Sequence, residues 1–185
     1  MASLFFNTKN YLNQEDGCMN FLAVEKENLQ VEYIGRGRDD LEAASIRAAM
    51  PIAPIPVPIS YFEAKVSDSG RDGYMSVGLM TKRCQLDKLV GWGVGSVGYH
   101  GDDGNLFMGN GIGKPYGPLY SKGDTVGCGI DWLNDQVFFT KNGAMISAVK
   151  SPFSQEEEVY PAVGLRTPRE RFLLNFGRKP FKFDI

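Results

Sequence analysis

The residues whose types and spacing could do chemistry lie in one glycine-rich stretch, GYHGDDGNLFMGNGIGKPYGP, at residues 98–118. It contains the only histidine of the chain, His100, followed by the adjacent carboxylates Asp102 and Asp103 and later by Lys114. A histidine beside a carboxylate is a common basis of acid–base catalysis. A glycine-rich turn before a lysine is typical of phosphate-binding loops, and carboxylates with a histidine are also metal ligands.

Neither nucleotide-binding motif is complete in this stretch. A Walker-type loop needs a serine or threonine after its lysine, but Pro115 follows Lys114, and Met108 stands where the first glycine is required. The dinucleotide fingerprint needs a helix after its glycines, which Pro115 and Gly117 prevent. We therefore expect no nucleotide and no other cofactor.

A metal site or a catalytic triad would depend on His100, because the chain has no other histidine. No cysteine lies close to it in sequence, and Tyr99 occupies the first ligand position of a calcium loop that would place its glycine at Gly104. We predict no metal site and no catalytic residue. A hydrolase that uses His100 with Asp102 or Asp103 remains the enzymatic alternative.

The same stretch has a simpler structural interpretation. Residues 96–100 and 105–108 can pair as a β-hairpin, with Asp102, Asp103 and Gly104 in its turn. Aspartates accept hydrogen bonds from nearby backbone amides, and glycine adopts the positive φ that such turns require. We therefore expect these residues to shape a turn.

Short segments with alternating apolar residues run through the chain and indicate half-buried β-strands. NLQVEY, YFEAKV and YMSVGL show the alternation, and TVGCGIDW, QVFFTKNG and AMISAVK are separated by turn residues, as in an antiparallel meander. The aromatic core candidates are Tyr99, Trp132, Phe138, Phe139 and Phe176. Because Phe138 and Phe139 face opposite sides of one strand, one of them should be less buried.

Two segments depart from the strand pattern. Residues 39–49, DDLEAASIRAA, begin with aspartates suited to an N-cap and continue with alanines, so propensity alone predicts a helix. Residues 50–60, MPIAPIPVPIS, are rich in proline and predict an extended surface connection. No repeat or flexible linker divides the chain, which favours one all-β domain built as an antiparallel sandwich.

The composition excludes several classes of protein. The chain has 185 residues and a net charge of -2, so it offers no general attraction for nucleic acid. No apolar run is long enough to span a membrane, and the N-terminus lacks the pattern of a signal peptide. The cysteines Cys18, Cys84 and Cys128 form no closely spaced pair and are expected to be reduced thiols. We expect a cytoplasmic protein, with a nuclear location also open.

Several motifs occur in a characteristic order: GRDGYMSVGL, GW, GYHGDDG, PYGP, GDTVGCGI, FFTKNG, YPAVGL, NFG and PFKFDI. Together they resemble the SPRY domain of the Ran-binding protein M family. The resemblance covers residues 29–185, with residues 1–28 as an N-terminal extension that packs on or precedes the domain. It implies a bent antiparallel β-sandwich, B30.2-like and concanavalin-like, in which EAASIRAAMPI is largely extended rather than helical.

The resemblance also implies a protein-binding module without catalysis. SPRY domains hold short peptides on loops at one edge of the sandwich. Carried over by position, the peptide-binding loops contain Ile34, Gly35, Arg36, Gly37 and Arg38, then Trp92, and then Leu165, Arg166, Thr167 and Pro168. Trp92 could equally belong to the core, and the arginines could be solvated loop charges.

The implied partners are peptide segments of other proteins. Longer members of the family add LisH and CTLH helical regions and act as substrate-receptor or scaffold subunits of a multi-subunit ubiquitin ligase. The partners would then include ligase subunits or substrates, and the domain itself would be monomeric. A secreted effector with the same fold is the remaining alternative.

Overall fold

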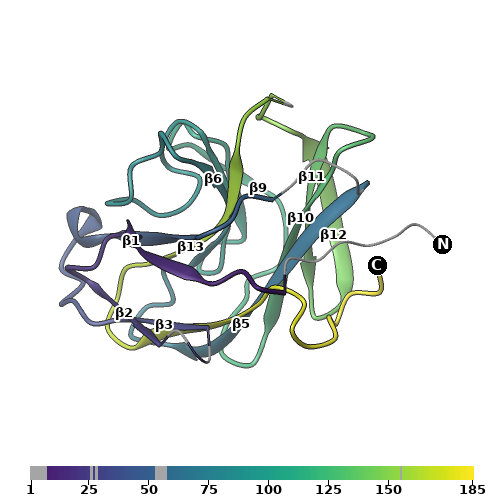
Figure 1. The fold of residues 1–185 in the computed structure, drawn as a ribbon. Helices are drawn as coiled ribbons and strands as arrows, with labels where there is room; N and C mark the ends of the chain where they lie inside the picture. The colour runs from purple at the N-terminus through teal and green to yellow at the C-terminus, as the bar shows by residue number, and fades with distance from the viewer. Residues whose placement is uncertain (1–7, 26, 28, 53–57, 155) are drawn as a thin grey trace.

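The computed structural model describes residues 8–25, 27, 29–52, 58–154 and 156–185. These residues form two seven-stranded antiparallel sheets (Figure 1), which confirms the predicted all-β sandwich. Of the proline-rich connection expected at residues 50–60, residues 53–57 lie outside the described residues. In the described part of the chain, no helix is long and apolar enough to cross a membrane.

The first sheet contains the strand that opens the glycine-rich stretch. Its strands, in spatial order, are β1 (Leu12–Gly17), β4 (Ala44–Ala48), β13 (Val159–Leu165), β6 (Ser76–Thr81), β7 (Ser96–His100), β8 (Asn105–Phe107) and β9 (Gly113–Pro115). The strands of the second sheet, in spatial order, are β12 (Ala144–Lys150), β11 (Gln136–Lys141), β10 (Thr125–Asp131), β5 (Ile59–Ser69), β14 (Glu170–Asn175), β3 (Gln30–Tyr33) and β2 (Leu22–Glu25).

The core lies between the two sheets and follows the predicted alternation. Tyr99 of β7 and Phe139 of β11 are both 0% exposed, and their ring centroids lie 5.7 Å apart across the interface. Phe62 and Phe172 extend the same layer and are 1% and 0% exposed. Removal of this apolar surface from water, at about 25 cal/mol per Å², is the main favourable contribution to folding.

The N-terminal strands pair with both sheets. Leu12 of β1 lies opposite Ala48 of β4, and Leu22 of β2 lies opposite Tyr33 of β3. Both leucines are almost completely buried. Strands before residue 29 therefore contribute to the core, while the boundary placed at that residue stays a prediction.

The helix that propensity predicts at residues 39–49 is wrong, and the extended conformation that the family resemblance implies for EAASIRAAMPI is confirmed by β4. Only Asp40–Glu42 forms a short 3₁₀ helix, η1, whose N-cap Asp39 accepts a hydrogen bond from the backbone of Leu41. The alanine-rich remainder is β4, which pairs with β1 on one side and β13 on the other and is buried along its whole length. Pairing on two sides and burial override the helix propensity of alanine.

The expected hairpin in the glycine-rich stretch is confirmed. Strands β7 and β8 pair antiparallel, with Tyr99 opposite Leu106, and Gly104 in the connection has a φ of 69°. Asp103 accepts hydrogen bonds from the backbone and side-chain amides of Asn105, at 2.9 and 2.8 Å. Asp103 therefore stabilises the turn, as aspartates do in such positions.

The expectation that Phe138 or Phe139 is less buried is wrong, because the C-terminal segment covers the outer face of the second sheet. Phe138 is 2% exposed, and the ring of Phe183 lies 5.9 Å from its ring. The backbone amides of Lys182 and Phe183 donate hydrogen bonds to Oε1 of Glu63, at 2.8 and 3.2 Å. Of the other core candidates, Tyr99, Phe139 and Phe176 are buried and Trp132 is half-buried.

Candidate functional site

Three loops meet at one end of the sandwich: residues 34–43 between β3 and β4, residues 70–75 between β5 and β6, and residues 166–169 between β13 and β14. We call them together the loop surface. Strand pairing places them at the same end, because Ser69 lies opposite Glu170 in the second sheet and Ser76 lies opposite Gly164 in the first. The loop surface contains two of the three loops predicted from the sequence.

Hydrogen bonds between backbone and side chains tie the three loops together. The guanidinium of Arg71 donates to the backbone oxygens of Arg36 and Gly37, at 3.3 and 2.5 Å. The backbone amide of Asp72 donates to Oγ1 of Thr167 at 3.2 Å. A Cβ at Gly37 would lie 2.6 Å from the carbonyl oxygen of Arg166, so only glycine permits this approach. The loops therefore present a fixed surface.

A buried carboxylate, that of Glu170, fixes the backbone of the loop between β13 and β14. Glu170 is 0% exposed and accepts hydrogen bonds from the backbone amides of Arg166 and Thr167, at 2.6 and 2.8 Å. It also accepts one from the hydroxyl of Thr167 at 2.5 Å. Burial raises the pKa of Glu170 to about 7, although these hydrogen bonds act in the opposite direction.

Arg166, which was predicted to bind a peptide, is largely engaged within the protein. Its guanidinium carbon lies 3.9 Å from the ring centroid of Tyr74, and its Nη1 pairs with Asp40. Its charge also lowers the pKa of Asp102, which burial raises to about 6. Stacking and ion pairing hold the guanidinium in one orientation, which reduces the entropy lost when it contacts a partner.

The exposed part of the loop surface combines arginine side chains with two large apolar side chains. Ile34 is 58% exposed and Leu41 is 85% exposed, and Arg36 is also exposed. Arg38, in contrast, donates from its backbone and side chain to the carboxylate of Glu42. Leu41 could not be chosen from the sequence, because it lay in the predicted helix. Its exposure in η1 adds it to the candidate site.

Trp92, the third predicted position, lies on a different part of the molecule. It is half-buried, and its ring packs on His100 and Phe107, with centroids 6.0 and 6.5 Å away. These partners belong to β7 and β8, on the outer face of the first sheet. The structure thus joins the loops at residues 34–38 and 165–168 by direct contact and places Trp92 against the β7–β8 hairpin.

His100 is buried on the outer face of the first sheet. It is 2% exposed, its ring lies 4.2 Å from that of Phe107, and its Nε2 donates to the carbonyl oxygen of Val90 at 2.8 Å. Burial lowers its pKa to about 4. A histidine enclosed in this way has no access to a substrate proton, so the geometry argues against His100 as a general base. Among the described residues, no group of three or more potential ligands is arranged for a metal.

The burial of His100 predicts a specific pH dependence. Between its folded pKa of about 4 and the ordinary value of 6.5, only the unfolded chain binds the proton. The wild type should therefore lose up to about 3 kcal/mol of stability, relative to His100→Gln, as the pH falls through this range. Urea unfolding of both proteins at several pH values measures this difference in stability. Glu170 and Asp102 change the stability in the opposite direction, but they do so equally in both proteins, so their contributions cancel. A difference that is constant with pH would contradict the prediction.

With the geometry in place, the comparison with known proteins decides the family. Residues 59–179 match the family model of the SPRY domain. The chain belongs to the SPRY domain family.

Relatives of this SPRY domain are longer proteins. It is 43% identical to Ran-binding protein 10 of Danio rerio over 166 residues, which are 90% of the chain and 27% of that relative. It is 44% identical to Ran-binding protein 9 of Xenopus laevis over 170 residues, 92% of the chain and 30% of the relative. It is 38% identical to the Ran-binding protein M homolog of Arabidopsis thaliana over 174 residues, 94% of the chain and 37% of the relative. The SPRY chain spans well under half the length of each.

Solved SPRY domains have the same fold. A crystal structure of a human SPRY domain superposes with a TM-score of 0.74 at 30% identity, covering 86% of this chain and 98% of that chain. The SPRY domain of human HERC1 superposes with a TM-score of 0.72 at 15% identity, covering 91% of this chain and 99% of that one, and this likeness shows the fold alone. Within this SPRY domain, the family match includes the loop at residues 166–168, and the loop at residues 34–38 precedes it.

Proposed function

We propose that the chain is a non-enzymatic interaction module that binds short linear segments of partner proteins on its loop surface. The observation that carries the proposal is the placement of exposed Ile34, Arg36 and Leu41 on loops that Arg71 and Glu170 hold in one conformation. Apolar anchors and arginines supply most of the binding energy in protein interfaces. Loops that are already ordered lose little entropy on binding.

The chemistry of the surface suggests the kind of segment that it accepts. Arg36 offers a planar fork to a carboxylate or a backbone carbonyl, and the two apolar side chains suit a hydrophobic residue next to that group. A short peptide on such a surface binds with micromolar affinity, or about 8 kcal/mol. We expect a polar or acidic peptide with one apolar anchor.

The resemblance to the Ran-binding protein M family supports a place for the module in a larger assembly. We propose that it serves as an adaptor or scaffold subunit of a CTLH-type ubiquitin ligase in the cytoplasm or the nucleus. Its partners would be other subunits or substrates of that ligase. The curated relatives are longer than the chain, which suits a binding unit within a multi-part protein.

The site is tested by the double variant Arg36→Ala with Leu41→Ala. Peptides are identified by cross-linking the chain to its partners in cells and mapping the linked segments, and each is then titrated by calorimetry. We expect the variant to bind at least about tenfold more weakly, because it lacks both the apolar side chain of Leu41 and the planar guanidinium of Arg36. Both side chains are exposed, so the thermal midpoint should not change.

The matched control is Arg83→Ala. Arg83 is an exposed arginine just after β6, whose other end adjoins the loop surface. It should leave the affinity unchanged. Equal affinity of the wild type and the double variant would reject the site, and failure of every mapped peptide to bind would reject peptide binding as the function.

A further inference from the structure

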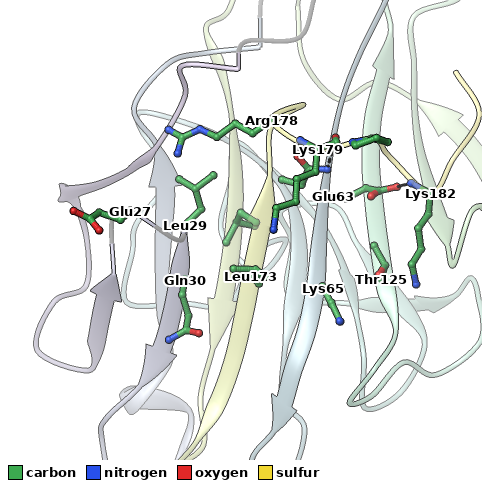
Figure 2. Close-up of a pocket in the computed structure, with 13 residues that line it drawn as sticks. Glu27, Leu29, Gln30, Glu63, Lys65, Thr125, Leu173, Arg178, Lys179 and Lys182 are labelled. Carbon is green, nitrogen blue, oxygen red and sulfur yellow. Dashed lines mark hydrogen bonds between the residues drawn. The ribbon is translucent and has the colours of Figure 1, made fainter.

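A groove with a volume of about 580 Å³ lies on the outer face of the second sheet (Figure 2). Its floor is formed by side chains of β3, β14, β5 and β10, and the segment after β14 forms its rim. The groove is separate from the loop surface. On β5 and β14 it is lined by two opposed pairs of residues, Lys65 with Leu173 and Glu63 with Asn175. The loop surface adjoins the other end of these two strands, where Ser69 lies opposite Glu170.

Three ammonium groups in this groove lack an anionic partner. Lys65, Lys179 and Lys182 line the groove and are exposed, and none forms an ion pair with any residue that the structure describes. The neighbouring Arg171 of β14, in contrast, pairs with Glu32 at 2.8 Å. Figure 2 shows the three lysines gathered over the strands that carry Leu173 and Thr125. Like charges held together without a counterion attract an anion.

The carboxylate of Glu63 keeps its charge but forms no ion pair with these lysines, and its Oε1 has three hydrogen-bond donors. It accepts hydrogen bonds from the backbone amides of Lys182 and Phe183 and from the hydroxyl of Tyr61. Glu63 is only 4% exposed. The other carboxylate of the groove, Glu27, belongs to the turn before β3. Four basic residues, Lys65, Arg178, Lys179 and Lys182, line the groove against these two carboxylates, so its net charge is positive.

The groove also offers apolar surface between its charges. Leu173 is half-buried on the floor, and Leu29 and Pro180 contribute further apolar atoms. A polyphosphate backbone would have no group to place on Leu173. The net charge of -2 also gives the chain no long-range attraction for nucleic acid. A protein segment with carboxylates on either side of an apolar residue matches both features of the groove.

We propose that this groove is a second binding site, which takes an acidic protein segment in extended conformation. Carboxylates of the segment contact Lys65, Lys179 and Lys182, and an apolar side chain packs on Leu173. Because the groove and the loop surface occupy different parts of the sandwich, one module holds two segments at once. A two-site module connects partners, which a single-site module does not do.

The proposal is tested with the full chain and a fluorescein-labelled, capped peptide in which a leucine is flanked by glutamates. Fluorescence anisotropy at low salt should give saturable binding, and replacement of the glutamates of the peptide by glutamines should weaken it at least about tenfold. The variant Lys65→Glu with Lys179→Glu should weaken binding by at least about the same factor. Replacement of the leucine by glycine should weaken it further.

The matched control is Lys114→Glu with Lys150→Glu, which makes the same change in net charge at exposed lysines outside the groove. It should bind the acidic peptide like the wild type. The milder variant Lys65→Gln with Lys179→Gln should give an intermediate loss, and a thermal midpoint equal to that of the wild type verifies its fold.

Three outcomes would overturn the groove as a site for an acidic segment. They are equal weakening by the groove and control variants, equal binding of the glutamine peptide, and tighter binding of an oligouridylate than of the acidic peptide. The loop variant Arg36→Ala with Leu41→Ala should retain the acidic peptide, so failure of the loop-surface proposal and failure of this one are distinguishable.

Discussion

Replacement of Glu170 by alanine should lower the free energy of unfolding by about 3 to 5 kcal/mol. The side chain is completely buried, and its loss leaves the backbone amides of Arg166 and Thr167 without their acceptor. Buried donors that lose a charged partner bear the full cost of desolvation. Urea unfolding followed by tryptophan fluorescence measures the change.

The same replacement should also loosen the loop surface. Thr167 contacts Asp72, and the loop of Arg166 touches Gly37, so release of this loop frees its neighbours. Peptide affinity should therefore fall at a temperature where the variant is still folded. The matched control is Glu156→Ala, in an exposed loop, which should change stability by less than about 0.5 kcal/mol. A loss below about 1 kcal/mol for Glu170→Ala would show that water replaces the carboxylate.

The local sequence pattern was sufficient to predict the structure where the interacting residues lie close in sequence. The turn of Asp103 and Gly104, and the alternation that places Tyr99 and Phe139 in the core, depend on neighbours or on the period of a strand. Both were predicted correctly. The sandwich could likewise be inferred from the spacing of strands and turns.

Predictions failed where a distant segment decides the environment. The alanines of β4 favour a helix until β1 and β13 pair on either side of them. Phe138 is covered by Tyr61 and by Phe183, and no local pattern connects Phe183 to it. Alternation along a strand shows on which face of the sheet each side chain lies, but not which segment covers that face.

In the candidate site, too, some features could be predicted from the sequence and others could not. Family resemblance predicted the loops of Arg36 and Arg166 as the candidate site, but not the residues that hold these loops or the exposed Leu41 in the first of them. In the sequence, Glu170 is one charged residue among many, at the start of a strand. Leu41 lies in the segment for which a helix was predicted, so its exposure in η1 was not expected. Their roles depend on burial and on contacts between loops, which a single sequence does not contain.

Gly98 provides the second large effect, because it permits a close approach that the sequence alone does not reveal. A Cβ at this position would lie 2.1 Å from the carbonyl oxygen of Val90. That oxygen also accepts the hydrogen bond from His100, and the following Trp92 packs on the same histidine. Gly98 therefore lets the segment that contains Val90 and Trp92 lie directly on β7.

Gly98→Ala should lower the free energy of unfolding by at least about 3 kcal/mol. The clash is with backbone, so we expect the segment of Val90 to lift from the sheet and expose His100. The matched control is Gly17→Ala, also in a strand, where the new Cβ would meet only side-chain atoms of Ile46 and Met19 at 3.0 and 3.1 Å. That control should cost less than about 1 kcal/mol, because flexible side chains can shift.

The two glycine variants also separate packing from an effect on the unfolded chain. Both replacements restrict the unfolded state equally, so the difference between them reports the clash at Val90. If the segment lifts, the indole of Trp92 becomes solvated and its fluorescence emission in the folded state of Gly98→Ala shifts to longer wavelength. Equal stability of the two variants, with unchanged emission, would show that β7 moves instead and that the segment at Val90 tolerates a side chain.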